Sequence, residues 1–137
     1  MPQPVDVRTL GLVVAGGAAG VLARAALLAP VSDPGAVPWV TLGINAVGSL
    51  LLGVVVGMLD GRRPRLRAFL GTGVLGGFTT YSAFAVDAAV WLSTPSLAGG
   101  LAAASVFAGV AGAVVGLAIG RRASGEPRTA VEPEVAE

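Results

Sequence analysis

The sequence predicts an all-α membrane protein with four transmembrane helices, the third of which is broken near its middle. Its 137 residues are 54% hydrophobic and only 12% charged, whereas soluble domains carry about 25% charged residues. The apolar residues gather in four segments that are separated by short polar links. Inside the third segment, residues 71–84 read GTGVLGGFTTYSAF and combine four glycines with two consecutive threonines.

The four apolar segments cover residues 10–29, 37–59, 69–92 and 97–119. Each has at least the length of about 20 residues that a helix needs to cross ~30 Å of hydrocarbon. The first segment could instead be a cleaved signal peptide, but it is longer than a simple signal core and Arg24 interrupts it. Residues 1–122 are therefore predicted to form one transmembrane domain. Residues 123–137 are rich in Glu and Pro and are expected to form a disordered cytoplasmic tail.

The arginines predict how the chain lies in the membrane. All nine basic residues are arginines, and eight of them lie before the first segment, in the second link or after the fourth segment. Positively charged loops stay in the cytoplasm, so both termini are expected there, in a multi-pass protein of the bacterial plasma membrane. Trp39 and Trp91 then fall at the outer interface, where indole rings are enriched.

The residue types present exclude several classes of function. The chain has no Cys, His or Lys, which removes disulfides, zinc sites, and thiol and imidazole chemistry. No activated nucleophile can be assembled without these residues, so an enzyme is not expected. The formal net charge of +1 gives no reason to expect a nucleic-acid partner.

Glycine and threonine both weaken a helix at the centre of the third segment. Glycine lowers helix propensity by ~1 kcal/mol, and threonine hydroxyls compete for backbone groups. Gly76, Gly77, Thr79 and Thr80 therefore favour a helix break near the bilayer midplane, where protein or a water-filled cavity must satisfy the freed backbone groups. The carbonyls at such a break suit a small cation. A continuous glycine-rich helix with close packing is the alternative.

Small residues recur every four positions in three of the segments. They are Gly16 and Gly20, then Ser49, Gly53 and Gly57, and then Gly112, Gly116 and Gly120. This spacing lines one face of a helix and lets two backbones approach closely. Four short helices enclose little interior, so a pathway through this protein would be shared between subunits, and an oligomer is expected.

Four polar residues inside the apolar segments are candidates for a site, and each has a structural alternative. Arg24 either snorkels to the outer interface or provides a fixed charge that attracts an anion. Asn45 either bridges two helices or offers its amide hydrogens to a ligand. Ser105 either bonds its own helix or lines a path. Asp87 either pairs with Arg24 or borders a path.

Tyr81 and Phe84 are three residues apart and share one face of any helix that resumes after the break. Such a pair is either packing or part of a site. The edge of an aromatic ring carries the positive end of the ring quadrupole. Ring edges, hydroxyls and an Asn amide could therefore replace water around a small, strongly hydrated anion without burying a full counter-charge.

Three motifs resemble those of the Fluc (CrcB-type) fluoride channels. They are GGAAGVLAR at residues 16–24, TLGINAVGS at residues 41–49 and GGFTTYSAF at residues 76–84. The motifs occur in the family's order, and the third is the most specific. The resemblance implies a passive, fluoride-selective channel that exports fluoride from the cytoplasm and lowers its toxicity. It also implies an antiparallel dimer with two narrow pores and a central structural sodium ion.

The resemblance further assigns roles to individual residues. The backbone carbonyls of Gly76 and Thr79 would hold the sodium ion. The fluoride pathway would consist of Arg24, Asn45, Tyr81, Ser82, Phe84 and Ser105. The family usually has Phe at the position of Tyr81, whose hydroxyl could add a hydrogen-bond donor or block one path.

The distribution of arginines departs from what an antiparallel homodimer needs. A chain that pairs with an inverted copy of itself must insert both ways round, which requires a weak charge bias. We therefore expect the partner to be a related chain of opposite orientation, with a homodimer as the alternative. The competing functions are a small proton-coupled multidrug-type transporter, which needs an intramembrane carboxylate, and a non-conducting structural membrane subunit.

Overall fold

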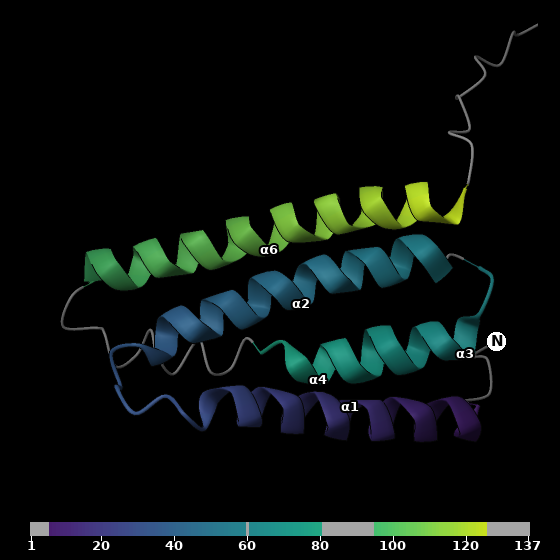
Figure 1. The fold of residues 1–137 in the computed structure, drawn as a ribbon, viewed down its shortest axis with the longest axis horizontal. Helices are drawn as coiled ribbons and strands as arrows, with labels where there is room; N and C mark the ends of the chain where they lie inside the picture. Colours follow the sequence, from purple (N-terminus) through teal and green to yellow (C-terminus); the bar gives the residue numbers. More distant parts are fainter. Residues whose placement is uncertain (1–5, 60, 81–94, 126–137) are drawn as a thin grey trace, which may run out of the picture.

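The computed structural model describes residues 6–59, 61–80 and 95–125, and every regular element within these ranges is a helix (Figure 1). The elements are α1 (Val7–Leu28), α2 (Val37–Leu59), α3 (Pro64–Arg67), the π-helix η1 (Ala68–Leu75), α4 (Gly76–Phe78) and α6 (Pro95–Ser124). The helices α1 and α2, and Gly99–Ser124 of α6, are long and apolar enough to cross a membrane. The chain is therefore an all-helical, multi-pass membrane protein.

The helix boundaries agree closely with the hydropathy segments. The helix α2 has the predicted bounds, α1 begins at Val7 rather than at residue 10, and α6 continues to Ser124. Gly125 follows α6 with φ 69°, a left-handed conformation that glycine adopts without strain and that ends the helix. The second half of the third predicted segment lies outside the described residues, as do residues 126–137 of the predicted tail. Residues 123 and 124, which were predicted to belong to that tail, are still helical.

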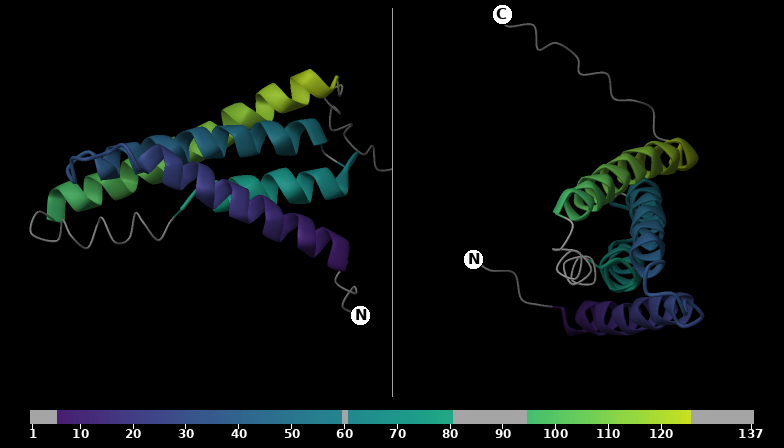
Figure 2. Two further views of the ribbon diagram at one scale, coloured as in Figure 1. Left: turned by 60° about the horizontal axis from the view of Figure 1, so that its bottom comes forward. Right: turned by 90° about the vertical axis from the view of Figure 1, so that its left-hand side faces the viewer.

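The helices pack in two pairs. The elements α3, η1 and α4 follow one another without interruption. Of these, η1 and α4 lie along α1, whereas α6 lies along α2 (Figures 1 and 2). The helices α1 and α2 are neighbours in sequence but make little contact with each other. Each long helix therefore has its main partner two segments away along the chain.

Glycine allows the close approach within both pairs. A Cβ atom at Gly116 of α6 would collide with the carbonyl oxygen of Leu50 in α2. In the other pair, a Cβ atom at Gly16 of α1 would lie 2.6 Å from the carbonyl oxygen of Phe69, closer than real Cβ atoms come to backbone. The packing role predicted for the four-residue stripes is thus confirmed.

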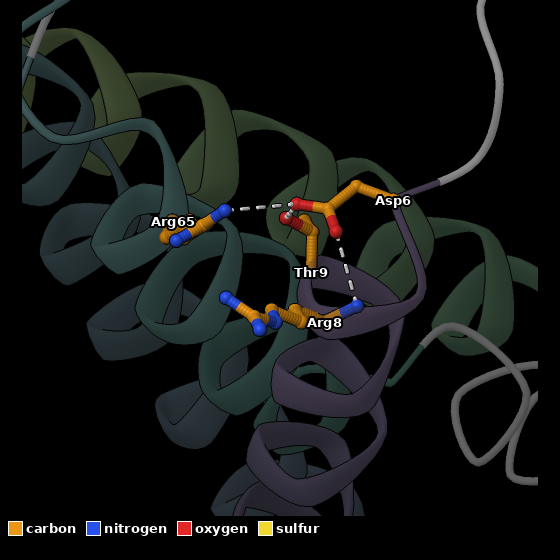
Figure 3. A network of polar contacts seen from close by, with 4 residues as sticks. All are labelled: Asp6, Arg8, Thr9 and Arg65. Atoms are coloured by element: carbon orange, nitrogen blue, oxygen red, sulfur yellow. Dashed lines mark hydrogen bonds and ion pairs between the residues drawn. The ribbon is translucent and has the colours of Figure 1, made fainter.

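The start of α1, the link after α2 and the end of α6 meet at one end of the bundle, on the right of Figure 1, and they carry seven of the eight described arginines. Arg65 Nη2 lies 3.5 Å from Asp6 Oδ2, which joins the second link to the start of α1 (Figure 3). Arg62 Nη1 donates to the Ser124 carbonyl oxygen at 3.1 Å, which joins the same link to the end of α6. Trp39 is 56% exposed near the start of α2, at the opposite end.

Acid is expected to loosen the first turn of α1. The Thr9 hydroxyl donates to Asp6 at 2.7 Å, and the Arg8 N–H donates at 3.1 Å (Figure 3). These bonds and the Arg65 charge hold the pKa of Asp6 below its ordinary value of 3.8, although partial desolvation opposes them. A lowered pKa means that the stabilisation is complete above pH 3.8 and is lost as the pH falls through the lower folded-state value.

Hydrogen exchange of the Arg8 amide, measured above and below that range and corrected for the intrinsic rate, tests this expectation. The control is Asp6→Asn, which keeps an acceptor oxygen but has no titrating group. An equal response to acid in this variant would contradict the assignment to Asp6.

Candidate functional site

The third helix ends at Thr79, close to the middle of its predicted span. Thr79 has extended backbone angles, φ −78° and ψ 147°, directly after α4. The Leu75 carbonyl accepts both the Thr79 N–H and the Thr79 hydroxyl, each at 2.9 Å. Competition of this kind between a hydroxyl and the helix backbone was the basis for predicting a break here.

The neighbouring glycines have a different role from the one that the sequence suggested. Gly76 and Gly77 remain helical in α4. A Cβ atom at Gly77 would collide with the carbonyl oxygen of Gly17 in α1. The absence of a side chain at Gly77 therefore permits close packing against α1, and the backbone leaves the helix only at Thr79.

The Asn45 side chain in α2 joins that helix to the backbone directly after the helix end. Its Oδ1 accepts the Thr80 N–H at 2.8 Å, and its Nδ2 donates to the Thr80 carbonyl oxygen at 3.0 Å. One side-chain amide thus satisfies both backbone groups of one residue, as a neighbouring strand would. The helix-bridging role of Asn45 is confirmed, and its second Nδ2 hydrogen remains for another acceptor.

A pocket of about 370 Å³ lies between α2, the end of the third helix and α6. Among the described residues, its polar lining consists of Asn45, Ser49, Thr79, Thr80 and Ser105, and its other lining residues are Ala102, Val106, Gly109 and Val110. None of these side chains carries a charge. The lining therefore offers neutral hydroxyl and amide groups to a small polar ligand.

Two buried hydroxyls, one of them at this pocket, have no hydrogen-bond partner within the described part of the chain. The Oγ atom of Ser105 lines the pocket and is buried. Thr41 is only 3% exposed, and its Oγ1 atom is likewise unpartnered. Buried hydroxyls are normally bonded, so the Ser105 hydroxyl is available to a ligand in the pocket.

The structure brings three of the predicted site residues together. Asn45, Thr79 and Ser105 line one pocket, and Gly76 lies one turn before Thr80 in the helix that leads to it.

Four other predicted residues remain, and the structure describes only one of them. Tyr81, Ser82 and Phe84 lie outside the described residues. Arg24 is half-buried on α1, which contributes no residue to the pocket lining.

Sequence reasoning assigned Ser49 only to packing and did not single out Thr41. Both are four residues from Asn45, on either side of it. Residues at this spacing share one helix face, so the position of Asn45 was the signal that could have identified them.

The family model described as CrcB-like protein, Camphor Resistance (CrcB), matches residues 11–117. The chain belongs to this family. A relative in Leifsonia xyli subsp. xyli, named fluoride-specific ion channel FluC 2, is 42% identical over 127 residues, which are 87% of this chain and 88% of the relative. A relative in Novosphingobium aromaticivorans, named fluoride-specific ion channel FluC, is 47% identical over 117 residues, 80% of this chain and 93% of the relative. The CrcB-like match spans the whole pocket, including the helix end at Thr79.

Proposed function

We propose that the chain is a subunit of a passive, fluoride-selective channel that lets fluoride leave the cytoplasm and so lowers its toxicity. The observation that carries this proposal is the polar pocket at the end of the third helix, whose described lining is uncharged, in a chain whose relatives are named fluoride-specific ion channels. Fluoride is small and strongly hydrated. Neutral hydrogen-bond donors can replace its water, whereas a fixed positive charge would bind the ion too tightly for it to leave.

The hydrogen-bond donors of the proposed pathway come from α2 and α6, on the two sides of the pocket. Ser49 and Ser105 contribute hydroxyls, and Asn45 contributes its second amide hydrogen. Tyr81, Ser82 and Phe84 follow Thr80 directly in the sequence and continue this row in our proposal. Arg24 acts at a distance from the pocket, as a positive charge on α1 that attracts the anion toward the membrane.

The sodium ion implied by the family resemblance would be held by the backbone carbonyls of Gly76 and Thr79. The helix end supports this assignment, because Thr79 is extended and its carbonyl has left the helical direction. Within the described residues, no N–H group bonds the Gly76 carbonyl. Oxygen ligands of this type suit a hard cation, and unwound carbonyls hold sodium in other membrane proteins.

An antiparallel dimer would complete the pathway. Val106 and Val110, on the α6 wall of the pocket, are 58% and 60% exposed, so a second chain can cover this side. The clustering of arginines at one end of the bundle supports a fixed orientation with cytoplasmic termini. A related chain of opposite orientation is therefore the partner that we propose.

Labelling of single cysteines placed at residue 2 and at residue 136 should show both termini protected in sealed cells and reactive after permeabilisation. A substantial population with both termini outside would instead indicate dual insertion and a homodimer.

Fluoride release from liposomes tests the function. Vesicles that contain the purified chain, alone or with a related chain of opposite orientation, should release fluoride well ahead of chloride, as read with a fluoride electrode. Phe84→Ile should abolish release while leaving the protein folded and assembled, which separates a channel from a structural subunit. If the wild-type chain releases no fluoride either alone or with the partner, the proposal is refuted.

A further inference from the structure

The hydrogen bonds of Asn45 change the bonding of the helix that they terminate. In an α-helix, each N–H group donates to the carbonyl four residues earlier. Thr79 follows this rule, since its N–H donates to Leu75 O at 2.9 Å. The Thr80 N–H would next donate to the Gly76 carbonyl, but it donates to Asn45 Oδ1 at 2.8 Å instead. Asn45 therefore removes the helical partner of the Gly76 carbonyl.

The same bonds also orient the Thr79 carbonyl. The Thr79 C=O and the Thr80 N–H belong to one planar trans peptide, in which the two groups point in opposite directions. Because the Thr80 N–H points at Asn45 in α2, the Thr79 carbonyl must point away from that side chain. Asn45 Nδ2 also donates to the Thr80 carbonyl oxygen at 3.0 Å. With both backbone groups of Thr80 held by one side chain, the Thr79–Thr80 peptide plane cannot rotate freely.

We infer that Asn45 is a positioning residue for the cation site: it frees the Gly76 carbonyl and aims the Thr79 carbonyl, so that both can face a cation. This inference rests on the sodium site proposed above and assigns its geometry to a side chain in another helix. Asn45 does not touch the cation in this arrangement.

The side-chain chemistry required at this position is narrow. The bonding partner of Thr80 must present one acceptor and one donor at the end of a short side chain, and it must be neutral at the edge of an uncharged pocket. A carboxylate has no donor, and a serine hydroxyl is too short to reach both groups. Asparagine meets all of these conditions.

The test measures sodium binding without using conduction. The full-length protein, with its partner chain if release requires one, is titrated with sodium against N-methylglucamine, and the sodium concentration that gives half of the thermal stabilisation is recorded. Asn45→Ser should raise this concentration by about tenfold or more. The variant loses the one or two hydrogen bonds that hold the carbonyls in place, and the free energy of these bonds corresponds to a change of that size in sodium affinity. Ser49→Ala is the matched control, because Ser49 lies one turn along the same pocket wall, and it should leave the midpoint unchanged.

A second substitution covers the case in which Asn45→Ser does not fold. Asn45→Gln keeps both the donor and the acceptor but moves them by one methylene away from the Thr80 groups, and it should raise the sodium midpoint in the same way. A wild-type sodium midpoint in either folded variant would overturn the inference. Fluoride release from the same preparations keeps the two proposals apart. A wild-type protein that releases fluoride but shows no sodium response overturns the inference alone, whereas an Asn45-dependent sodium response without fluoride release overturns only the proposed function.

Discussion

Gly116→Ala is expected to lower the free energy of unfolding by about 3 kcal/mol, the upper part of the range for forcing a methyl group into a packed interior. The added Cβ atom would collide with the Leu50 carbonyl oxygen and would lie 3.0 Å from the Val54 nitrogen. Both obstacles belong to the backbone of α2, so they cannot move aside by changing a rotamer. The two helices must separate along their whole contact, and thermal unfolding in detergent should show the loss.

Gly100→Ala is the matched control for this prediction. It makes the same chemical change in the same helix, but a Cβ atom at Gly100 meets nothing within 4 Å. Because alanine has the higher helix propensity, this variant should unfold at or above the wild-type temperature. If Gly116→Ala were as stable as Gly100→Ala, the close contact between α2 and α6 would be wrong.

Gly109→Val should reduce fluoride release by at least roughly tenfold, since a tenfold loss needs only ~1.4 kcal/mol of additional barrier. Gly109 lines the pocket, and a Cβ atom there would lie 3.5 Å from Ser49 Oγ, an ordinary contact distance. The two γ-methyl groups of valine would then occupy space beside the Ser49 hydroxyl and would offer no donor to an anion. The initial rate of release from liposomes at equal protein content measures the effect.

Gly109→Ser is the control that shows whether Gly109→Val acts through its apolar methyl groups and not by disturbing the fold. Its Cβ atom occupies the same position, but the single atom beyond Cβ is a hydroxyl oxygen that can donate a hydrogen bond. We expect this variant to retain conduction, and we expect both variants to match the wild-type unfolding temperature because neither meets backbone. Wild-type release by Gly109→Val would show that the pathway does not run past Ser49.

Hydropathy and charge were sufficient to predict those parts of the fold that the bilayer determines. The bounds of α2 and the grouping of arginines at one end follow from the length of an apolar segment and from the polarity of its links. These properties are local in the sequence, so they could be predicted without knowledge of any contact.

The details of the helix end depend on contacts between distant segments, and these were harder to predict. Gly76 and Gly77 suggested the break, but Gly77 stays in the helix because α1 packs closely at that point. Asn45 was a candidate for both bridging and ligand binding. Its bridging role became clear only from its hydrogen bonds to Thr80, which lies 35 residues away in the sequence. Ser49 resembled a packing residue because a small side chain serves either purpose.

The pairing of α1 with the third helix and of α2 with α6 has a consequence for biosynthesis. Helices leave the ribosome in order, but α1 and α2, which are made first, make little contact with each other. The glycine face of α1 stays open to lipid until η1 has been inserted, and that of α2 stays open until α6 has been inserted. The two helix pairs therefore alternate along the chain, and a nascent chain that stops before α6 leaves α2 without its main partner. Assembly becomes complete only with the last helix, so α2 stays in the membrane without its main partner until synthesis is nearly finished.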